Sequence, residues 1–346
     1  MKVLHLLQSP HFSGAENVVC QIIGMFGDEP DIEMAYCSQD GQIRNALAER
    51  NIKFFPMSVL CKSEVKRVIK EYKPDIIHAH DMRASFIAAI CCGKIPLVSH
   101  IHNNAFGSRG LSIKSIAYIL AGLKAKHIFW VSTSSFDGYF FKKLFTKKSS
   151  VLQNIIDIDA LYKKMEMDEK EYNYDIVYVG RLTFQKNPER LIEVIKKICE
   201  LDTGISVAIV GTGDLEVTAK KLCCENKLDE NIDFLGFCPN PLKIMYDSKV
   251  MIMTSRWEGT PMCALEAQSL GVPIVSTPVD GLCDIIANGK NGFLSDDNDV
   301  LAQKLYEVVT NDSLHQELSK NSKTLMHKLM ETKQYQKAIK NIYESV

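Results

Sequence analysis

The stretch Ser255–Pro273, SRWEGTPMCALEAQSLGVP, decides the fold that we expect for this chain. It follows an apolar run, Val250–Met253, that is typical of a buried strand in a parallel sheet. Thr260 and Pro261 suit the cap and the first position of a helix, and Gly271 suits its left-handed end. The sequence therefore predicts a strand end, a short loop and a helix N-terminus in direct succession.

Such a helix start is an anion site, because the amide groups of Met262 and Cys263 would lack intrahelical acceptors. Two carboxylates flank it, Glu258 in the loop and Glu266 in the second turn of the helix. A carboxylate beside bound phosphate would be repelled, so we expect both to accept hydrogen bonds from sugar or ribose hydroxyls. The alternative is that Glu258 is an ordinary loop charge and Glu266 belongs to a solvated helix face.

A second loop with suitable charges follows the predicted strand at 175–180. It contains Arg181 and Lys186 and ends at Asn187-Pro188, a cap and first position for the next helix. Two cations at the carboxyl edge of a sheet can neutralise a diphosphate, the arginine by a bidentate fork and the lysine as a point charge. Taken alone, they are equally compatible with ordinary surface cations.

The rest of the chain alternates strand-like runs with amphipathic helical stretches, in two blocks. This pattern predicts an α/β protein of two tandem Rossmann-like, doubly wound domains. The charged segment YKKMEMDEKEYNY separates the blocks. The expected organisation is an N-terminal domain at 1–161, a linker at 162–174, a C-terminal domain at 175–312 and a helical tail at 313–346. The expected strands lie at 2–8, 33–38, 53–57, 75–80, 97–103, 127–132, 175–180, 206–211, 233–237, 250–255, 273–277 and 292–295.

The first block offers weaker signals. Gly14 opens the first expected helix and permits close backbone approach to a ligand. Two histidine pairs, His78/His80 and His100/His102, end predicted strands, and each pair lies on one strand face. Buried structural histidines are the simpler interpretation, with His102 best placed to reach a ligand. A zinc site is less favoured, since no carboxylate or cysteine has matching spacing.

The net charge of −1 conceals an asymmetry. Residues 1–150 hold 19 basic and 12 acidic residues, a net charge of +7, which leaves −8 for the remainder. Within 83–150 the only acid is Asp137. An anionic partner is one interpretation, either lipid headgroups or a phosphate-bearing acceptor, and a solvated basic face is the other. No apolar run suggests a signal peptide or a spanning helix, and the eleven cysteines show no metal-binding spacing, so we expect a cytoplasmic chain.

Taken together and in order, these motifs resemble the retaining glycosyltransferases of family 4, which have the GT-B fold of two domains facing across a cleft. The resemblance covers nearly the whole chain, and the spacing of Glu258 and Glu266 is that family's hallmark. The motifs that carry it are Ser13-Gly14-Ala15-Glu16, His102, Gly180-Arg181, Lys186-Asn187, Glu258-Gly259 and Glu266.

The resemblance implies a role for each motif residue. Arg181 and Lys186 would bind the donor diphosphate and stabilise the leaving nucleotide, and Glu266 would hold the ribose. Glu258 would bind hydroxyls of the donor sugar, which His102 would also contact. Gly14 would let its loop approach the phosphates, and the tail would cross back onto the N-terminal domain. The backbone around sugar and phosphate would come from Gly259, Thr260, Pro261, Met262 and Cys263.

The implied reaction retains the anomeric configuration and requires no metal or other cofactor, because cations neutralise the leaving group. We expect a nucleoside-diphosphate sugar donor, with UDP favoured over GDP, and no nucleic-acid partner. The expected acceptor is a saccharide or a polyprenyl-linked saccharide in bacterial surface polysaccharide synthesis. The basic region suggests peripheral contact with the anionic inner membrane. A sugar-nucleotide 2-epimerase with the same fold and a two-lobed ligand-binding protein remain the alternatives.

Overall fold

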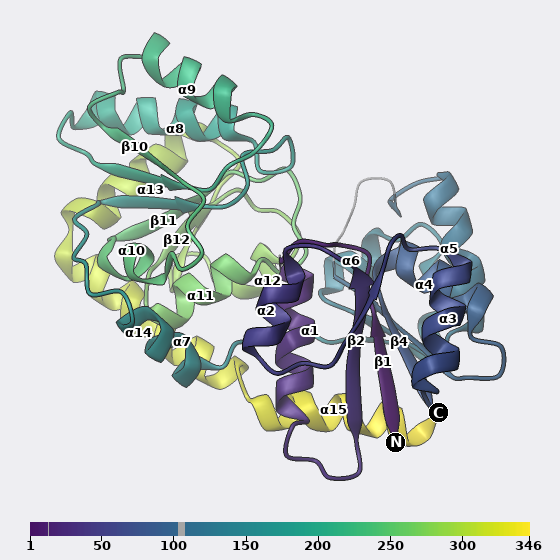
Figure 1. Ribbon diagram of the computed structural model, residues 1–346. Helices are drawn as coiled ribbons and strands as arrows, with labels where there is room; N and C mark the ends of the chain where they lie inside the picture. The colour runs from purple at the N-terminus through teal and green to yellow at the C-terminus, as the bar shows by residue number, and fades with distance from the viewer. Residues whose placement is uncertain (13, 103–107) are drawn as a thin grey trace. The chain divides into compact units, whose positions relative to one another are not determined.

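The computed structural model describes residues 1–12, 14–102 and 108–346 of the chain. These residues divide into two compact units. Unit 1 comprises residues 1–155 together with 331–346, and unit 2 comprises residues 156–330. Each unit contains its own parallel sheet (Figure 1). The boundary falls at 155/156 rather than at the expected 161, and the last sixteen residues rejoin unit 1.

Unit 1 is a seven-stranded parallel sheet with the order β3-β2-β1-β4-β5-β6-β7. The order reverses between β1 and β4, as in a doubly wound fold. Six of the strands were predicted, whereas the short β7 was not. The strands are β1 (Lys2–Leu6), β2 (Glu33–Gln39), β3 (Phe54–Met57), β4 (Ile76–His80), β5 (Leu97–Ile101), β6 (His127–Trp130) and β7 (Ser149–Val151).

Helices cover both faces of this sheet. Because side chains alternate along a strand, Leu4 and Leu6 pack with α3, α4 and α5 on one face, whereas His5 lies on the other. The helices of this unit are α1 (Gly14–Met25), α2 (Ile43–Glu49), α3 (Lys62–Tyr72), α4 (Asp81–Cys91), α5 (Ile113–Lys124), α6 (Thr133–Gly138) and α15 (Thr332–Ser345), with the 3₁₀ turns η2 (Lys142–Leu144) and η3 (Thr146–Lys148).

Unit 2 is a six-stranded parallel sheet with the order β10-β9-β8-β11-β12-β13, reversing between β8 and β11. The strands are β8 (Ile176–Val179), β9 (Val207–Val210), β10 (Ile232–Gly236), β11 (Val250–Met253), β12 (Ile274–Ser276) and β13 (Gly292–Leu294). The helices are α7 (Ile158–Glu166), α8 (Pro188–Leu201), α9 (Glu216–Glu225), α10 (Leu242–Asp247), α11 (Met262–Leu270), α12 (Leu282–Ile285), α13 (Asn298–Thr310) and α14 (Asp312–Leu329).

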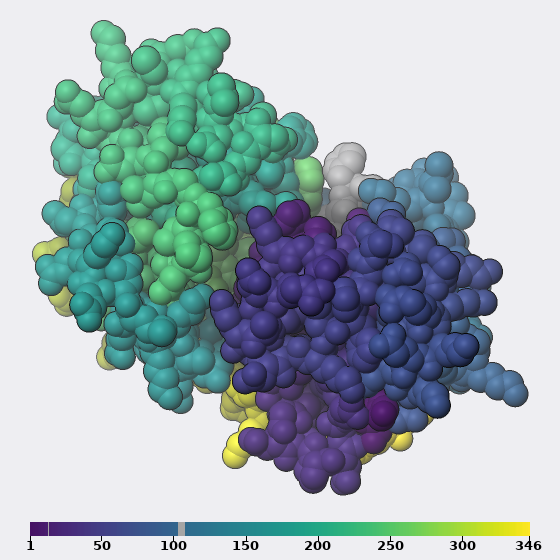
Figure 2. Space-filling model, viewed as in Figure 1, coloured from purple at the N-terminus to yellow at the C-terminus, as the bar shows by residue number. Residues whose placement is uncertain are grey.

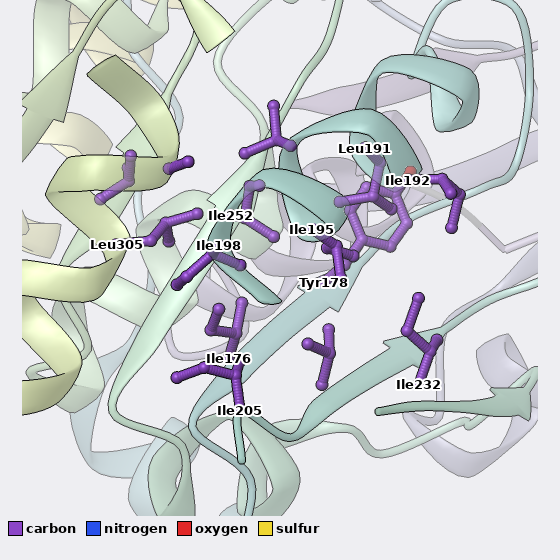
Figure 3. Close-up of a cluster of buried hydrophobic side chains, with 14 of the residues drawn as sticks. Ile176, Tyr178, Leu191, Ile192, Ile195, Ile198, Ile205, Ile232, Ile252 and Leu305 are labelled. Carbon is purple, nitrogen blue, oxygen red and sulfur yellow. The ribbon is translucent and has the colours of Figure 1, made fainter. Parts of the chain in front are cut away.

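A hydrophobic core of unit 2 lies between the sheet and helices α8 and α13. Figure 3 shows Ile176, Ile195, Ile198 and Leu305 in this layer, with Tyr178 beside Ile195. α8 buries its residues at helical spacing, so its apolar stripe faces the strands. This packing fixes the loop before α8, which carries two predicted site residues.

The expected linker contains part of a helix. α7 begins after Asp157, whose carboxylate accepts a hydrogen bond from the amide of Ala160 at 2.9 Å. Leu161 and Met165 are buried. Their spacing of four residues puts them on one helix face, a signal that the high charge of the segment obscured. The linker boundaries of 162–174 were therefore wrong over residues 162–166.

The expected tail divides between the units. α14 packs against α11 and α13 in unit 2, and only α15 joins unit 1. α15 buries Tyr335, Ile339 and Tyr343, and it lies beside α1 (yellow against purple in Figures 1 and 2). Hence the prediction that residues 313–346 return to the N-terminal domain was wrong for α14, because apolar residues of this helix belong to the core of unit 2.

Candidate functional site

The predicted donor-binding residues gather at the carboxyl edge of the unit 2 sheet. Two loops meet there, residues 180–187 after β8 and residues 254–261 after β11. These strands are neighbours at the point where the strand order reverses, the place where ligands bind in open α/β sheets. The Arg256 amide donates to the carbonyl of Gln185 at 2.8 Å, and Thr254 Oγ1 donates to the carbonyl of Lys186 at 3.2 Å. The two loops therefore form one rigid rim.

Lys186 and Glu258 form a buried ion pair across this rim. Lys186 Nζ lies 2.6 Å from Glu258 Oε1, and Ser255 Oγ donates to the same oxygen at 2.6 Å. The side chains are only 13% and 5% exposed. Burial opposes a charge on Lys186, but the adjacent carboxylate outweighs it and raises the pKa of the ammonium group. The sequence predicted both residues, although not that each neutralises the other.

Arg181 is the uncompensated cation of the same loop. Its side chain is exposed, and it makes no ion pair with any residue that the structure describes. The hydroxyl of Tyr178 donates to the carbonyl of Arg181 at 3.1 Å and holds the backbone in place. The exposed guanidinium group is available to an anionic ligand.

α11 begins one residue later than expected. Pro261 is extended (φ −70°, ψ 126°) and occupies the cap position, so the helix starts at Met262 and the prediction of Thr260 as cap was wrong. The amides of Ala264 and Leu265 donate back to the Pro261 carbonyl, at 3.1 and 3.3 Å. The preceding amides, those of Met262 and the residue after it, have no such acceptor in the helix. These are the same two amides that the sequence predicted, although the helix begins one residue later, and their binding of an anion stays a prediction.

Burial raises the pKa of two ionisable side chains on α11. Burial raises the pKa of Glu266, an effect that Lys164 on α7 partly opposes. Burial also raises the pKa of the Cys263 thiol to about 11. Cys263 is thus protonated near neutral pH and is no nucleophile. Lys164 was not predicted, because it lies in the segment interpreted as a linker.

A third loop, after β12, completes the rim. Asp280 Oδ2 accepts a hydrogen bond from the Glu258 amide at 2.9 Å. A Cβ atom on Gly281 would lie 1.7 Å from the carbonyl oxygen of Gly259, so only glycine permits this approach. Neither residue was predicted. The available signal was an Asp-Gly pair shortly after a predicted strand, at the sheet edge where the other loops end.

Unit 1 holds a chain of hydrogen-bonded histidines on one face of its sheet. His5 Nδ1 lies 3.0 Å from His80 Nε2, and His80 Nδ1 lies 2.8 Å from His102 Nε2. His78 and His100 stack alongside, and His78 Nδ1 lies 2.6 Å from the hydroxyl of Tyr343 on α15. Burial lowers the pKa of His102 to about 3, so the ring is neutral. The predicted shared face of each histidine pair is confirmed.

The histidine nitrogens also meet the distance requirement for a metal. His5, His78 and His80 form one triad whose ligand atoms lie within 4.8 Å of one another, and His80, His100 and His102 form a second. In each triad, however, a pair of nitrogens already shares a hydrogen bond. The absence of a metal stays a prediction, as does the contact of His102 with a sugar.

The remaining predicted positions are placed as follows. Gly14 is exposed at the first residue of α1, after β1, and its approach to phosphates stays a prediction. Ser13 and Asn103 lie outside the described residues.

A surface groove of about 870 Å³ between α8 and Asp296–Asp299 contains none of the predicted site residues. Ion pairs such as Arg190–Asp296, at 2.8 Å, line it.

Comparison with known proteins covers both units. Residues 14–160 match the family model for glycosyltransferase family 4, and residues 163–325 match that for glycosyl transferases group 1. An uncharacterised glycosyltransferase of Methanocaldococcus jannaschii is 29% identical over 252 residues, 66% of this chain and 62% of the relative. The UDP-Gal:alpha-D-GlcNAc-diphosphoundecaprenol alpha-1,3-galactosyltransferase of Escherichia coli is 26% identical, over 93% of this chain and 91% of the relative.

Solved structures show the same fold. The Anabaena protein HepE, crystallised with UDP-glucose, superposes with a TM-score of 0.87 at 20% identity, with both chains fully covered. A Thermosynechococcus elongatus sucrose-phosphate synthase superposes with a TM-score of 0.79 at 13% identity, over 99% of this chain and 98% of that one. The predicted fold class, with two Rossmann-like domains, is thereby confirmed.

Proposed function

Because the chain belongs to family 4 of the GT-B glycosyltransferases, we propose that it transfers a sugar from a nucleoside diphosphate to a saccharide acceptor. Unit 2 binds the donor and unit 1 binds the acceptor. The observation that carries this proposal is the rim of unit 2, where the exposed Arg181, the Lys186–Glu258 pair and the start of α11 adjoin one sheet edge.

The charges of the rim suit a leaving diphosphate. As the bond to the anomeric carbon breaks, negative charge accumulates on the phosphate oxygens. Arg181 supplies a full positive charge, and the first amides of α11 supply partial ones. Since Glu258 neutralises Lys186, the ammonium group contributes hydrogen bonds more than net charge. These groups perform the neutralisation for which other enzymes use a metal ion, so the transfer is metal-independent.

The two acids bind hydroxyl groups. Glu258 Oε1 already accepts from Lys186 and Ser255, and its other oxygen accepts no hydrogen bond from the described residues. That oxygen is available to a hydroxyl of the donor sugar. Glu266, whose pKa burial raises, gains a partner when it accepts a hydrogen bond from the ribose. Neither acid acts as a nucleophile, and the configuration is retained by attack from the face that the diphosphate leaves.

The donor is a UDP-sugar and the acceptor is a lipid-linked saccharide of a surface polysaccharide. Support for the base comes from the name of the Escherichia coli relative and from HepE, which was crystallised with UDP and with UDP-glucose. Support for the acceptor comes from that same relative, named for GlcNAc-diphosphoundecaprenol, and from a Staphylococcus aureus relative named for poly(ribitol-phosphate).

The test is a transfer assay with purified protein, excess EDTA and a synthetic GlcNAc-diphosphate lipid. UDP-glucose, UDP-galactose, UDP-GlcNAc and GDP-mannose are compared as donors, and proton NMR coupling gives the configuration of the product. We expect turnover with a UDP-sugar in EDTA and an α-linked product. Glu266→Gln should reduce kcat/KM by about a hundredfold, whereas Glu317→Gln on the exposed face of α14 should not.

Four results would contradict the proposal. Activity that disappears in EDTA would exclude the metal-independent mechanism. A β-linked product would exclude retention. Turnover with GDP-mannose alone would exclude the assigned donor. No turnover with any of the donors, even with several saccharide acceptors present, would exclude the transfer itself.

A further inference from the structure

α5 exposes apolar residues where a surface helix normally exposes polar ones. Its inner side buries Ser115, Tyr118, Ala121 and Gly122 in unit 1. On its outer side four aliphatic residues follow one another at spacings of three and four, which places them on a single stripe. Their exposed fractions are 88% for Ile113, 52% for Ile116, 49% for Leu120 and 63% for Leu123.

The segment after α6 extends this stripe. Phe145 packs so tightly on α5 that a Cβ atom on Gly122 would lie 2.5 Å from its ring. Lys148 Nζ donates to the carbonyls of Leu123 and Ala125, at 3.1 and 2.8 Å. These contacts place η2 and η3 beside the C-terminal half of α5. Leu144, which is 57% exposed, lies in this segment and adds to the apolar surface.

Within residues 83–150, which contain the stripe, the charges are all positive apart from one neutralised pair. Asp137, the only acid in 83–150, lies 2.7 Å from Lys142 and is matched by it. Five further lysines are exposed and form no ion pair within the described part of the chain: Lys114, Lys124, Lys126, Lys143 and Lys147. The surface therefore combines unpaired ammonium groups with a row of aliphatic side chains.

We propose that this surface, the α5 face, docks on an anionic lipid bilayer. The α5 face consists of Ile113, Ile116, Leu120, Leu123 and Leu144 with those five lysines. The aliphatic side chains enter the headgroup region, and the ammonium groups contact lipid phosphates, as in interfacial helices that lie in the membrane plane. α5 lies on the surface without crossing it, and no described helix is long and apolar enough to span a bilayer.

The lysines decide between a membrane and a second copy of the chain. In a two-fold symmetric dimer through the α5 face, five ammonium groups would meet five others without an intervening carboxylate. An anionic bilayer provides the opposite charge over the whole patch and an apolar layer beneath it. The docking does not depend on which sugar is transferred, so its failure and the failure of the proposed function can be told apart.

The test is co-sedimentation of the full chain with large vesicles. Vesicles of phosphatidylcholine alone are compared with vesicles that also contain phosphatidylglycerol, at low and at high salt. We expect binding only with phosphatidylglycerol, and weaker binding at high salt. Both Ile113→Ser/Leu120→Ser and Lys124→Glu/Lys143→Glu should reduce the vesicle-bound fraction at least about tenfold at low salt, since each removes one of the two contributions.

Val217→Ser is the matched control, because Val217 is 81% exposed on α9 in unit 2. It should bind vesicles as the wild type does, and all variants should keep the wild-type melting temperature. Wild-type protein that stays in the supernatant with anionic vesicles at low salt would overturn the proposal. So would face variants that bind normally, or a lipid-free dimer in gel filtration that the Ile113→Ser/Leu120→Ser variant dissociates.

Discussion

At the scale of single residues, the Lys186–Glu258 pair is the part of the rim on which other contacts depend. Both side chains are almost fully buried, and Ser255 and Asp280 add hydrogen bonds to the carboxylate and to the amide of Glu258. Removing one member of a buried charge pair is strongly destabilising, because the other charge then stays buried without a partner. The pair therefore serves two purposes, holding the two loops together and orienting a carboxylate toward the site.

This arrangement predicts a strongly non-additive effect on stability. Lys186→Met leaves a buried carboxylate without a cation and should lower the free energy of unfolding of unit 2 by about 3 kcal/mol. Lys186→Met/Glu258→Gln removes both charges and should lie within about 1 kcal/mol of the wild type. Urea denaturation of the two variants gives both values. A double variant that loses as much stability as the single one would show that the pair is not buried as described.

Gly281 gives a second prediction at this scale. In Gly281→Ala the new Cβ would lie 1.7 Å from the Gly259 carbonyl, which belongs to the backbone and cannot rotate away. The loop after β11 must shift, so we expect a loss of about 2 kcal/mol or more in stability together with weaker nucleotide binding.

Gly24→Ala is the matched control, because Gly24 lies in α1 and a Cβ atom added there would have no neighbour within 4 Å. It should increase stability by about 0.5 to 1 kcal/mol, as alanine favours a helix. Thermal unfolding of both variants tests the pair of predictions. Equal stability of the two would contradict the close approach at Gly281.

At the scale of elements, the histidine-bearing strands of unit 1 and α15 form one polar layer. Burial lowers the pKa of all five histidines, to about 3 for His5 and His102 and well below the ordinary value for the others. Several ring nitrogens, including both of His100, find no hydrogen-bond partner among the described residues. The layer therefore folds only with neutral rings.

Acid should accordingly destabilise unit 1. Below about pH 6.5 these histidines bind protons in the unfolded chain but stay neutral in the folded layer. The free energy of unfolding therefore falls as the pH drops from 6.5 toward 3. Each histidine contributes about 1.4 kcal/mol per pH unit within that window. Urea unfolding at several pH values measures the slope. His100→Gln should make this slope shallower by the contribution of one histidine. A slope that His100→Gln does not alter would contradict a neutral, buried His100.

The elements also show what sequence reasoning could and could not reach. Of the thirteen strands among the described residues, twelve follow apolar runs between turn signals, so local pattern predicted them. The helix in the expected linker and the division of the tail depend on partners far along the chain, which local pattern does not contain. Asp280 reaches the site because β12 lies next to β11. His5 joins the other histidines because β1 lies next to β4. Both require the strand order to be known.

At the scale of the whole molecule, the charge is divided unevenly along the chain. The first 150 residues have a net charge of +7, and the remainder has −8. The positive excess gathers in unit 1 around the α5 face, whereas the anion site of unit 2 relies on a few placed groups within an acidic unit. This contrast supports separate roles for the two units. Unit 1 is attracted to an anionic surface in general, and unit 2 recognises a diphosphate specifically.

The central claim is that a nucleoside diphosphate binds at the unit 2 rim, held by Arg181 and the start of α11. Isothermal titration calorimetry of the full chain with UDP tests it directly. We predict binding by the wild type, affinity about tenfold to a hundredfold lower in Arg181→Ala, and unchanged affinity in Lys221→Ala, a cation on the exposed face of α9. Equal affinity of Arg181→Ala and the wild type, or no heat of binding with UDP at all, would contradict the claim.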